Sequence, residues 1–98
     1  MDKEQALELV RRYKQVISPR FNEVKVYMFG SYSKGSAHAD SDIDVAVIVP
    51  SFGDDWWAVT KGLWHDVRQV STLIEPVLME ESKPSPLFED VMRTGIAV

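Results

Sequence analysis

The fold is decided between residues 23 and 49, which read EVKVYMFGSYSKGSAHADSDIDVAVIV. Residues 23–29 are rich in β-branched and aromatic side chains at alternate positions, and this pattern predicts a strand. Residues 42–49 repeat the alternation with isoleucine and valine, and predict a second strand. Between the strands, Gly30 and Ser31 break the pattern. Residues 31–36 have room for one or two helical turns with Ser31 as the cap, and residues 35–41 form a loop.

An amphipathic helix is predicted before this stretch, over residues 3–17, with Asp2 as its N-cap. Ser18-Pro19 ends it, because the residue before a proline is pushed out of the helical region. Its apolar residues recur at spacings of three and four: Ala6, Leu9, Val10, Tyr13, Val16 and Ile17.

After residue 49 the chain predicts three more elements and a final strand. A helix begins at Asp54 or Asp55 and runs to about Ser71, residues 72–79 form a third strand, and residues 87–93 form a short helix before a strand at 96–98. Pro76 places the third strand at a sheet edge or makes it irregular, since proline cannot donate to a ladder. One stripe of the long helix is expected to face inward: Trp56, Thr60, Leu63, Val67 and Val70.

The alternation of helices and strands predicts an α/β (α+β) fold, a small mixed β-sheet flanked by helices. With 98 residues we expect a single domain over 1–98, which can bury one modest core but no large substrate cavity as well. The net charge of −4 disfavours nonspecific binding of a long nucleic acid. There is no cysteine, and no apolar run predicts a membrane span or a signal peptide, so a cytoplasmic protein is expected.

Two aspartates at the start of the second strand carry the chemistry. Asp42 and Asp44 are two residues apart, so both carboxylates leave the same face of the strand, with Cα atoms roughly 7 Å apart. Such oxygen ligands suit Mg²⁺ or Mn²⁺. The Gly30-Ser31 turn opposite them allows close backbone approach and offers a hydroxyl and amides to an anion, which suits a triphosphate.

Each of these features also has an ordinary structural explanation. An Asp-x-Asp pair is most often a solvated strand face, and glycine-serine is most often only a turn. However, Ala46 and Ile48 share the face of the aspartates and have the character of buried residues. Two carboxylates at the end of a buried strand are costly unless they are paired or bound to metal. This conflict favours a functional site.

The run from Gly30 to Gly35, followed by Ser41-Asp42-Ile43-Asp44-Val45, resembles the signature of the DNA polymerase beta-like nucleotidyltransferase superfamily. The resemblance is strongest to its minimal nucleotidyltransferase (MNT) branch, which includes MNT-type antitoxins. The order of elements matches that branch along nearly the whole chain, including a closing helix and the turn at residues 93–96. The resemblance implies a nucleotidyltransferase-like fold.

The resemblance also implies roles for individual residues on the nucleotide side. Gly30 and Ser31 fall on the phosphate-binding turn, with Ser31 in contact with the triphosphate. Ser41 belongs to the same motif and is a candidate nucleotide-binding residue. Lys34 lies where the family often has a basic residue that contacts a phosphate, although a solvated loop lysine is the alternative.

On the metal side, Asp42 and Asp44 fall on the two metal-binding catalytic carboxylates. The family's third carboxylate lies on the next strand, where Glu75 is the candidate to complete the metal site or accept the hydroxyl proton. Glu75 departs from the usual aspartate and is followed by Pro76, so an exposed edge carboxylate without a role is the alternative. The departure affects catalysis more than nucleotide binding.

The implied function is Mg²⁺-dependent transfer of a nucleoside monophosphate, AMP from ATP, to an acceptor hydroxyl. The small size implies that a second protein or a second copy completes the acceptor site. In the family the common partner is a helical HEPN-type toxin, neutralised in some cases by adenylylation of a tyrosine. The alternative is a nucleotide-binding subunit, catalytically weak, that silences its partner by contact. A third possibility is an α/β domain unrelated to nucleotides, in which the aspartates are incidental.

Other candidate residues have weaker support. His38 and His65 lack the spacing of metal ligands, and Asp40 is expected to cap its loop. Trp56, Trp57 and Trp64 exceed what one core stripe can bury, and Trp57 and Trp64, seven apart, share a flank. They form either ordinary packing or an exposed apolar patch for a partner.

Overall fold

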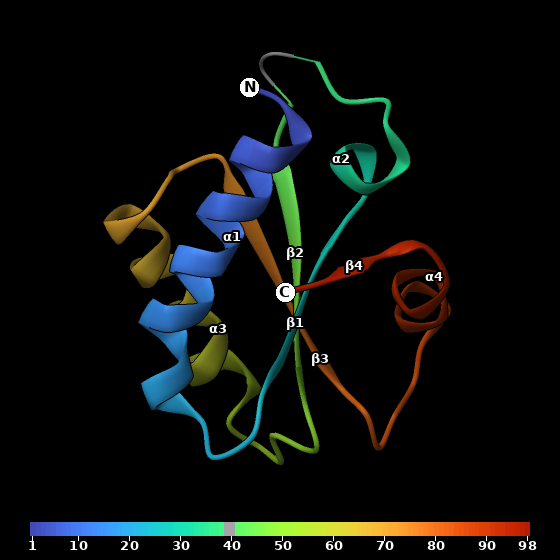
Figure 1. Ribbon diagram of the computed structural model, residues 1–98. Helices are drawn as coiled ribbons and strands as arrows, with labels where there is room; N and C mark the ends of the chain where they lie inside the picture. Colours follow the sequence, from blue (N-terminus) through green and yellow to red (C-terminus); the bar gives the residue numbers. More distant parts are fainter. Residues whose placement is uncertain (39–40) are drawn as a thin grey trace.

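The structure, a computed structural model, describes residues 1–38 and 41–98. Four α-helices and four strands alternate along these residues (Figure 1), and short 3-10 turns follow α1 and α3. The elements are α1 (Lys3–Ile17), η1 (Ser18–Arg20), β1 (Lys25–Phe29), α2 (Ser31–Lys34), β2 (Ile43–Val49), α3 (Trp56–Asp66), η2 (Val67–Gln69), β3 (Ile74–Glu80), α4 (Pro86–Thr94) and β4 (Ile96–Ala97). The predicted mixed α/β class is confirmed.

Helix α1 has the predicted bounds, and its capping explains why. Asp2 accepts a hydrogen bond from the amide of Gln5 at 2.8 Å, and the Gln5 side chain accepts one from the amide of Asp2, also at 2.8 Å. This capping box satisfies two of the free amides at the helix start. The helix ends at Ile17, and Pro19 lies inside the 3-10 turn that follows.

The four strands form one mixed sheet in the order β3-β2-β1-β4. β1 is antiparallel to both β2 and β4, whereas β2 and β3 are parallel. β3 therefore lies at an edge of the sheet, as Pro76 predicts. An edge strand has one side without a neighbouring strand, where a proline nitrogen, which has no hydrogen to donate, can be accommodated. Because β2 is central, its side chains are buried on both faces from Val45 to Val49.

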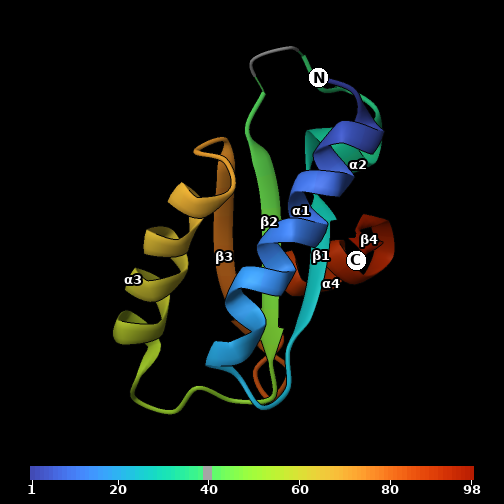
Figure 2. The same ribbon diagram turned by 60° about the vertical axis from the view of Figure 1, so that its left-hand side comes forward.

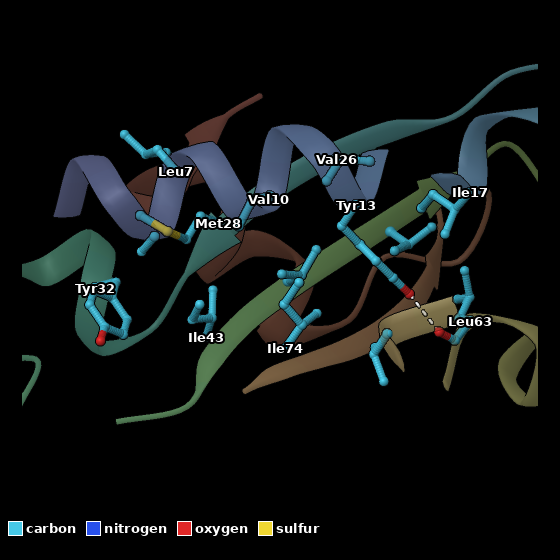
Figure 3. Packing of buried hydrophobic residues seen from close by; sticks show 14 residues of the cluster. Leu7, Val10, Tyr13, Ile17, Val26, Met28, Tyr32, Ile43, Leu63 and Ile74 are labelled. Atoms are coloured by element: carbon cyan, nitrogen blue, oxygen red, sulfur yellow. Dashed lines mark hydrogen bonds between the residues drawn. The ribbon is translucent and has the colours of Figure 1, made fainter. Parts of the chain in front are cut away.

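Helices α1 and α3 cover one face of the sheet (Figures 1 and 2). The main core lies between them and the sheet, and Figure 3 shows its members from α1, α2, α3 and the strands. Tyr13 is fully buried there, and its hydroxyl donates a hydrogen bond of 2.8 Å to the carbonyl of Leu63. This bond joins the two helices across the core without leaving a buried hydroxyl unpaired.

Helix α4 covers the opposite face of the sheet (Figure 1). Its Val91 packs with Phe29, Ala46, Ile48 and Met79 in a second, smaller core. Asp44, Ala46 and Ile48 are two residues apart along β2, so their side chains share one face of the strand. Asp44 is therefore the first residue of a strand face whose following side chains, Ala46 and Ile48, are buried. The burial of this face, inferred from the sequence, is confirmed.

Three local predictions are wrong. Gly30, not Ser31, is the N-cap of α2, and α2 has no side-chain cap. Helix α3 ends at Asp66 and gives way to a 3-10 turn rather than continuing to Ser71. Trp56 does not join the buried stripe, because it is 44% exposed. Asp55 holds the N-cap position of α3 without a side-chain hydrogen bond.

Among residues 1–38 and 41–98, none of the helices has the length and apolar character that crossing a lipid bilayer requires. This agrees with the absence of a long apolar run in the sequence.

Candidate active site

Gly30 and Asp44 meet at the point where β1 ends. Gly30 has a positive φ of 74°, a conformation that residues with a Cβ rarely adopt. A Cβ built on Gly30 would collide with Oδ2 of Asp44. The glycine is therefore needed twice, for the backbone turn and for the space that the carboxylate occupies. The structure thus brings the turn and one of the predicted carboxylates into direct contact.

The sheet register brings Glu75 to the same place. Asp44 lies opposite Phe29 on β1 and opposite Glu75 on β3, so the two acidic residues are direct neighbours across the parallel ladder. Asp42 precedes β2 by one residue and is exposed, whereas Asp44 and Glu75 are half-buried. The carboxylates of Asp42, Asp44 and Glu75 therefore lie near one another at one end of the sheet, where β2 and β3 begin.

The electrostatics of this acidic group follow from crowding. Burial raises the pKa of Asp44, and the charge of Asp42 raises it further. Burial likewise raises the pKa of Glu75, followed by the charge of Asp42, a hydrogen bond with Asp42 and the charge of Asp44. Like charges held together in this way disfavour full ionisation. A cation bound between them would relieve the repulsion.

The donor set fits a hard divalent cation, because all three side chains offer carboxylate oxygens and a cation would offset the repulsion between their charges. Within the described part of the chain, however, no three histidine, cysteine, aspartate or glutamate side chains are grouped closely enough to hold a metal ion as they stand. Asp42 and Asp44 are the pair that would hold the cation, and Glu75 stands next to them.

Lys34 is held beside the turn by a residue that the sequence alone did not single out. Its Nζ lies 3.4 Å from Oδ2 of Asp90 on α4, and Oδ1 of Asp90 accepts a hydrogen bond of 2.7 Å from Nη2 of Arg93. The bond from Arg93, together with the charge of Lys34, lowers the pKa of Asp90. Asp90 thus pairs both with Lys34, the last residue of α2, and with Arg93 on its own helix. Residues 34 and 90 are too distant in sequence for any local pattern to link them.

The loop before β2 is closed by Ser41. Its hydroxyl accepts a hydrogen bond of 2.7 Å from the amide of His38, and its own amide donates to the His38 carbonyl at 3.0 Å. Tyr32 is buried under the turn, and its hydroxyl reaches the same carbonyl at 3.5 Å. Asp40, the expected loop cap, lies outside the described residues.

The family model described as "Nucleotidyltransferase domain" matches residues 10–85, a span that includes the turn and all three carboxylates. The chain belongs to this nucleotidyltransferase family. A Methanocaldococcus jannaschii protein, provisionally named a protein adenylyltransferase, is 23% identical over 97 residues, which cover 94% of this chain and 97% of that protein.

Solved structures agree with the nucleotidyltransferase fold. A crystal structure of a Sulfolobus solfataricus protein, provisionally named a nucleotidyltransferase, superposes with a TM-score of 0.71 at 17% identity, covering 97% of this chain and 80% of that one. A complex of tri-AMPylated HEPN toxin with MNT antitoxin from Shewanella oneidensis gives a TM-score of 0.59 at 20% identity, covering 94% and 70%. At these identities the likeness shows the fold.

Proposed function

We propose that this nucleotidyltransferase transfers AMP from ATP to a hydroxyl group of a partner protein, in a reaction that requires Mg²⁺ or Mn²⁺. The observation that carries the proposal is the contact between Gly30 and Asp44, which places a turn suited to phosphates against an acidic pair suited to a cation. Membership of the family supports the reaction type. The relative named a protein adenylyltransferase and the AMPylated HEPN complex support AMP and a protein acceptor.

The side chains have distinct roles in this reaction. Asp42 and Asp44 would hold the cation, which would neutralise phosphate charge that develops during the displacement. The Gly30-Ser31 turn and Ser41 bind the nucleotide, and Lys34 offers a further positive charge to the phosphates. The acceptor oxygen attacks the α-phosphorus, the bond from that phosphorus to the oxygen that leads to the β-phosphate breaks, and pyrophosphate leaves. Glu75, whose pKa is raised, takes the proton of the acceptor hydroxyl.

The acceptor site is completed by a second molecule. The carboxylates lie at the end of the sheet, at a half-buried to exposed edge, so an acceptor can approach from outside the chain. A helical HEPN-type toxin is the proposed partner, with this chain as its antitoxin, in line with the Shewanella oneidensis complex.

A second candidate function is neutralisation of the partner by binding alone. Two features favour it: the resemblance to the family leads one to expect an aspartate where this chain has Glu75, and three tryptophans on α3 are exposed. In this case nucleotide binding would persist but transfer would be weak or absent.

Labelled ATP separates the two candidates. The full chain is incubated with α-labelled ATP and Mg²⁺, with and without the HEPN-type protein encoded in the same genome. Transfer of label to the partner that is lost in Asp44→Ala, and kept in the matched control Asp54→Ala at an exposed loop position, supports the enzyme. A stable complex without label supports the binding subunit.

A further inference from the structure

The outer surface of α3 carries aromatic and basic side chains together. Trp57 and Trp64 are 63% and 45% exposed, which is unusual for the largest apolar side chain. With Thr60, they line a groove of about 560 Å³ whose remaining members are basic or titratable: Lys61, His65 and Arg68. Trp57, Lys61 and Trp64 follow spacings of four and three on α3, and Arg68 in the 3-10 turn that follows continues the row along the groove. We call this set the tryptophan stripe.

The stripe differs in charge from the rest of the molecule. The chain carries a net charge of −4, yet none of the acidic residues in the described part of the chain lines the groove. Asp66, the acidic residue of this helix segment, is buried and faces Arg20 instead. Across the residues that the structure describes, neither Lys61 nor Arg68 forms a salt bridge. The groove therefore offers two positive charges beside two partly exposed indole rings.

The charges argue against a second copy of this chain as the occupant. In a two-fold dimer a surface meets its own copy, so Lys61 and Arg68 would approach the same cations of the other molecule. A single-stranded nucleic acid is also disfavoured. One ring face of Trp57 is covered by the stacked ring of Trp56, with centroids 5.9 Å apart, and the acidic protein as a whole repels a polyanion.

We propose that the tryptophan stripe docks an amphipathic helix of the partner protein, with apolar side chains against Trp57 and Trp64 and acidic side chains opposite Lys61 and Arg68. Tryptophan and arginine are the residues that most often dominate binding at such surfaces, and an apolar helix face is the shape that fits a groove beside a helix. This inference rests on the proposed function for the identity of the partner, a HEPN-type helical protein.

The position of the stripe relates docking to the site. Helix α3 ends at Asp66, the 3-10 turn ends at Gln69, and β3 begins at Ile74, one residue before Glu75. Arg68, at one end of the stripe, thus lies shortly before the end of the sheet where Glu75 and Asp44 are found. A partner bound along α3 would be held beside that edge, near enough to present an acceptor hydroxyl.

The test measures binding of the full chain to the HEPN-type protein of the same genome by calorimetry, without nucleotide or metal, so that the result does not depend on transfer. We expect Trp64→Ala to weaken binding at least tenfold and K61E/R68E at least a hundredfold. The matched control K3E/R12E makes the same change in net charge at exposed positions of α1, and we expect it to change the dissociation constant less than threefold. Circular dichroism confirms that each variant is folded.

Equal weakening by K61E/R68E and K3E/R12E would overturn the proposal, because only overall charge would then matter. Absence of binding by the unaltered chain would also overturn it. So would a self-association, or an affinity for single-stranded RNA, that Trp64→Ala abolishes while binding to the HEPN-type protein is unchanged. The transfer assay is scored separately: label transfer without stripe-dependent binding leaves the enzyme proposal standing, and stripe-dependent binding without transfer leaves the docking proposal standing.

Discussion

Two regions of the molecule remove charged or polar groups from water, and they do so in opposite ways. Between α1 and α3, the buried carboxylate of Asp66 accepts hydrogen bonds of 2.5 and 3.0 Å from Arg20, and the hydroxyl of Tyr13 is bonded to Leu63. At the end of the sheet, Asp44 and Glu75 are placed next to each other and to Asp42. The first region pairs opposite charges, and the second gathers like charges.

This difference distinguishes residues that stabilise the fold from residues that are candidates for function. A buried charge with a bonded partner contributes to the stability of the fold or costs little. Like-charged carboxylates crowded together destabilise the fold, so they are retained where a ligand makes use of them. The comparison predicts that substitutions of Asp44 and its acidic neighbours affect activity more than stability. Substitutions at the Arg20–Asp66 pair are expected to affect stability more than activity.

The largest effect is expected for Asp44→Asn, which keeps the shape of the side chain but removes the negative charge proposed to hold the cation. AMP transfer should fall about a thousandfold or more, since the lost electrostatic stabilisation acts on the transition state. The melting temperature of the metal-free protein should stay the same or rise, because the raised pKa of Asp44 means that its charged form disfavours the folded state.

The same variant gives a pH test. A raised carboxyl pKa means that stability is greatest below the ordinary value and is lost as the pH rises through the raised one. Urea unfolding of the metal-free wild type at several pH values should show this loss, and Asp44→Asn should reduce it. An equal pH dependence in both proteins would contradict the crowding of charges.

The next largest effect is expected for Gly30→Ala, with Gly35→Ala as its control. Both glycines have positive φ, but Gly35 (φ 77°, ψ 15°) is left-handed helical, where alanine costs about 1 kcal/mol, whereas Gly30 (φ 74°, ψ −145°) lies close to a region open almost only to glycine, where alanine costs more. Only at Gly30 does the new Cβ meet Asp44, whereas nothing lies within 4 Å at Gly35. Transfer activity should therefore fall at least a hundredfold in Gly30→Ala and less than tenfold in Gly35→Ala. Equal losses would contradict a special requirement for glycine at position 30, where backbone conformation and the contact with Asp44 both demand it.

Asp66→Ala is expected to affect stability rather than chemistry. It removes a two-bond ion pair whose carboxylate is buried, but Arg20 is 42% exposed and can return to water. We therefore expect a loss of about 2 kcal/mol in the free energy of unfolding, measured in urea, with activity per folded molecule unchanged. Asp54→Ala, at an exposed loop position, should change the stability by less than about 0.5 kcal/mol.

The smallest effect is expected for Lys34→Ala. Lys34 lies beside the turn, but it already has Asp90 as a partner and is largely exposed, so its contribution to phosphate binding is screened. The KM for ATP should rise about fivefold with little change in kcat. Lys3→Ala on α1 is the control and should leave both values unchanged. A loss in kcat larger than that in KM would assign Lys34 a role in the chemical step.

Much of the fold could be predicted from local patterns. The capping box at Asp2, the alternation in β1 and β2, and Pro76 in the edge strand are signals carried by neighbouring residues, and the elements appear where these signals place them. The same reasoning failed at Trp56, because spacing alone does not show which side chains of a helix meet the sheet. It also failed at the end of α3, because the apolar spacing continues through the 3-10 turn that follows Asp66.

The candidate site could be predicted only in part. The turn and the two aspartates lie close together in the sequence, so their spacing was informative. The pairing of Lys34 with Asp90 and of Arg20 with Asp66 joins residues 56 and 46 positions apart. These pairs depend on α4 and α3 packing on opposite faces of the sheet, which no local pattern specifies.

The central claim is that the Gly30-Ser31 turn and the aspartates bind a divalent cation and a polyphosphate together. The most direct measurement is titration of Mn²⁺ into the full chain, followed by electron paramagnetic resonance, with and without a non-hydrolysable ATP analogue. The account predicts that Mn²⁺ binds more tightly when the analogue is present, and that D42N/D44N abolishes this binding while E4Q/E8Q, at exposed positions of α1, preserves it. Equal Mn²⁺ binding by the wild type and D42N/D44N would contradict the account.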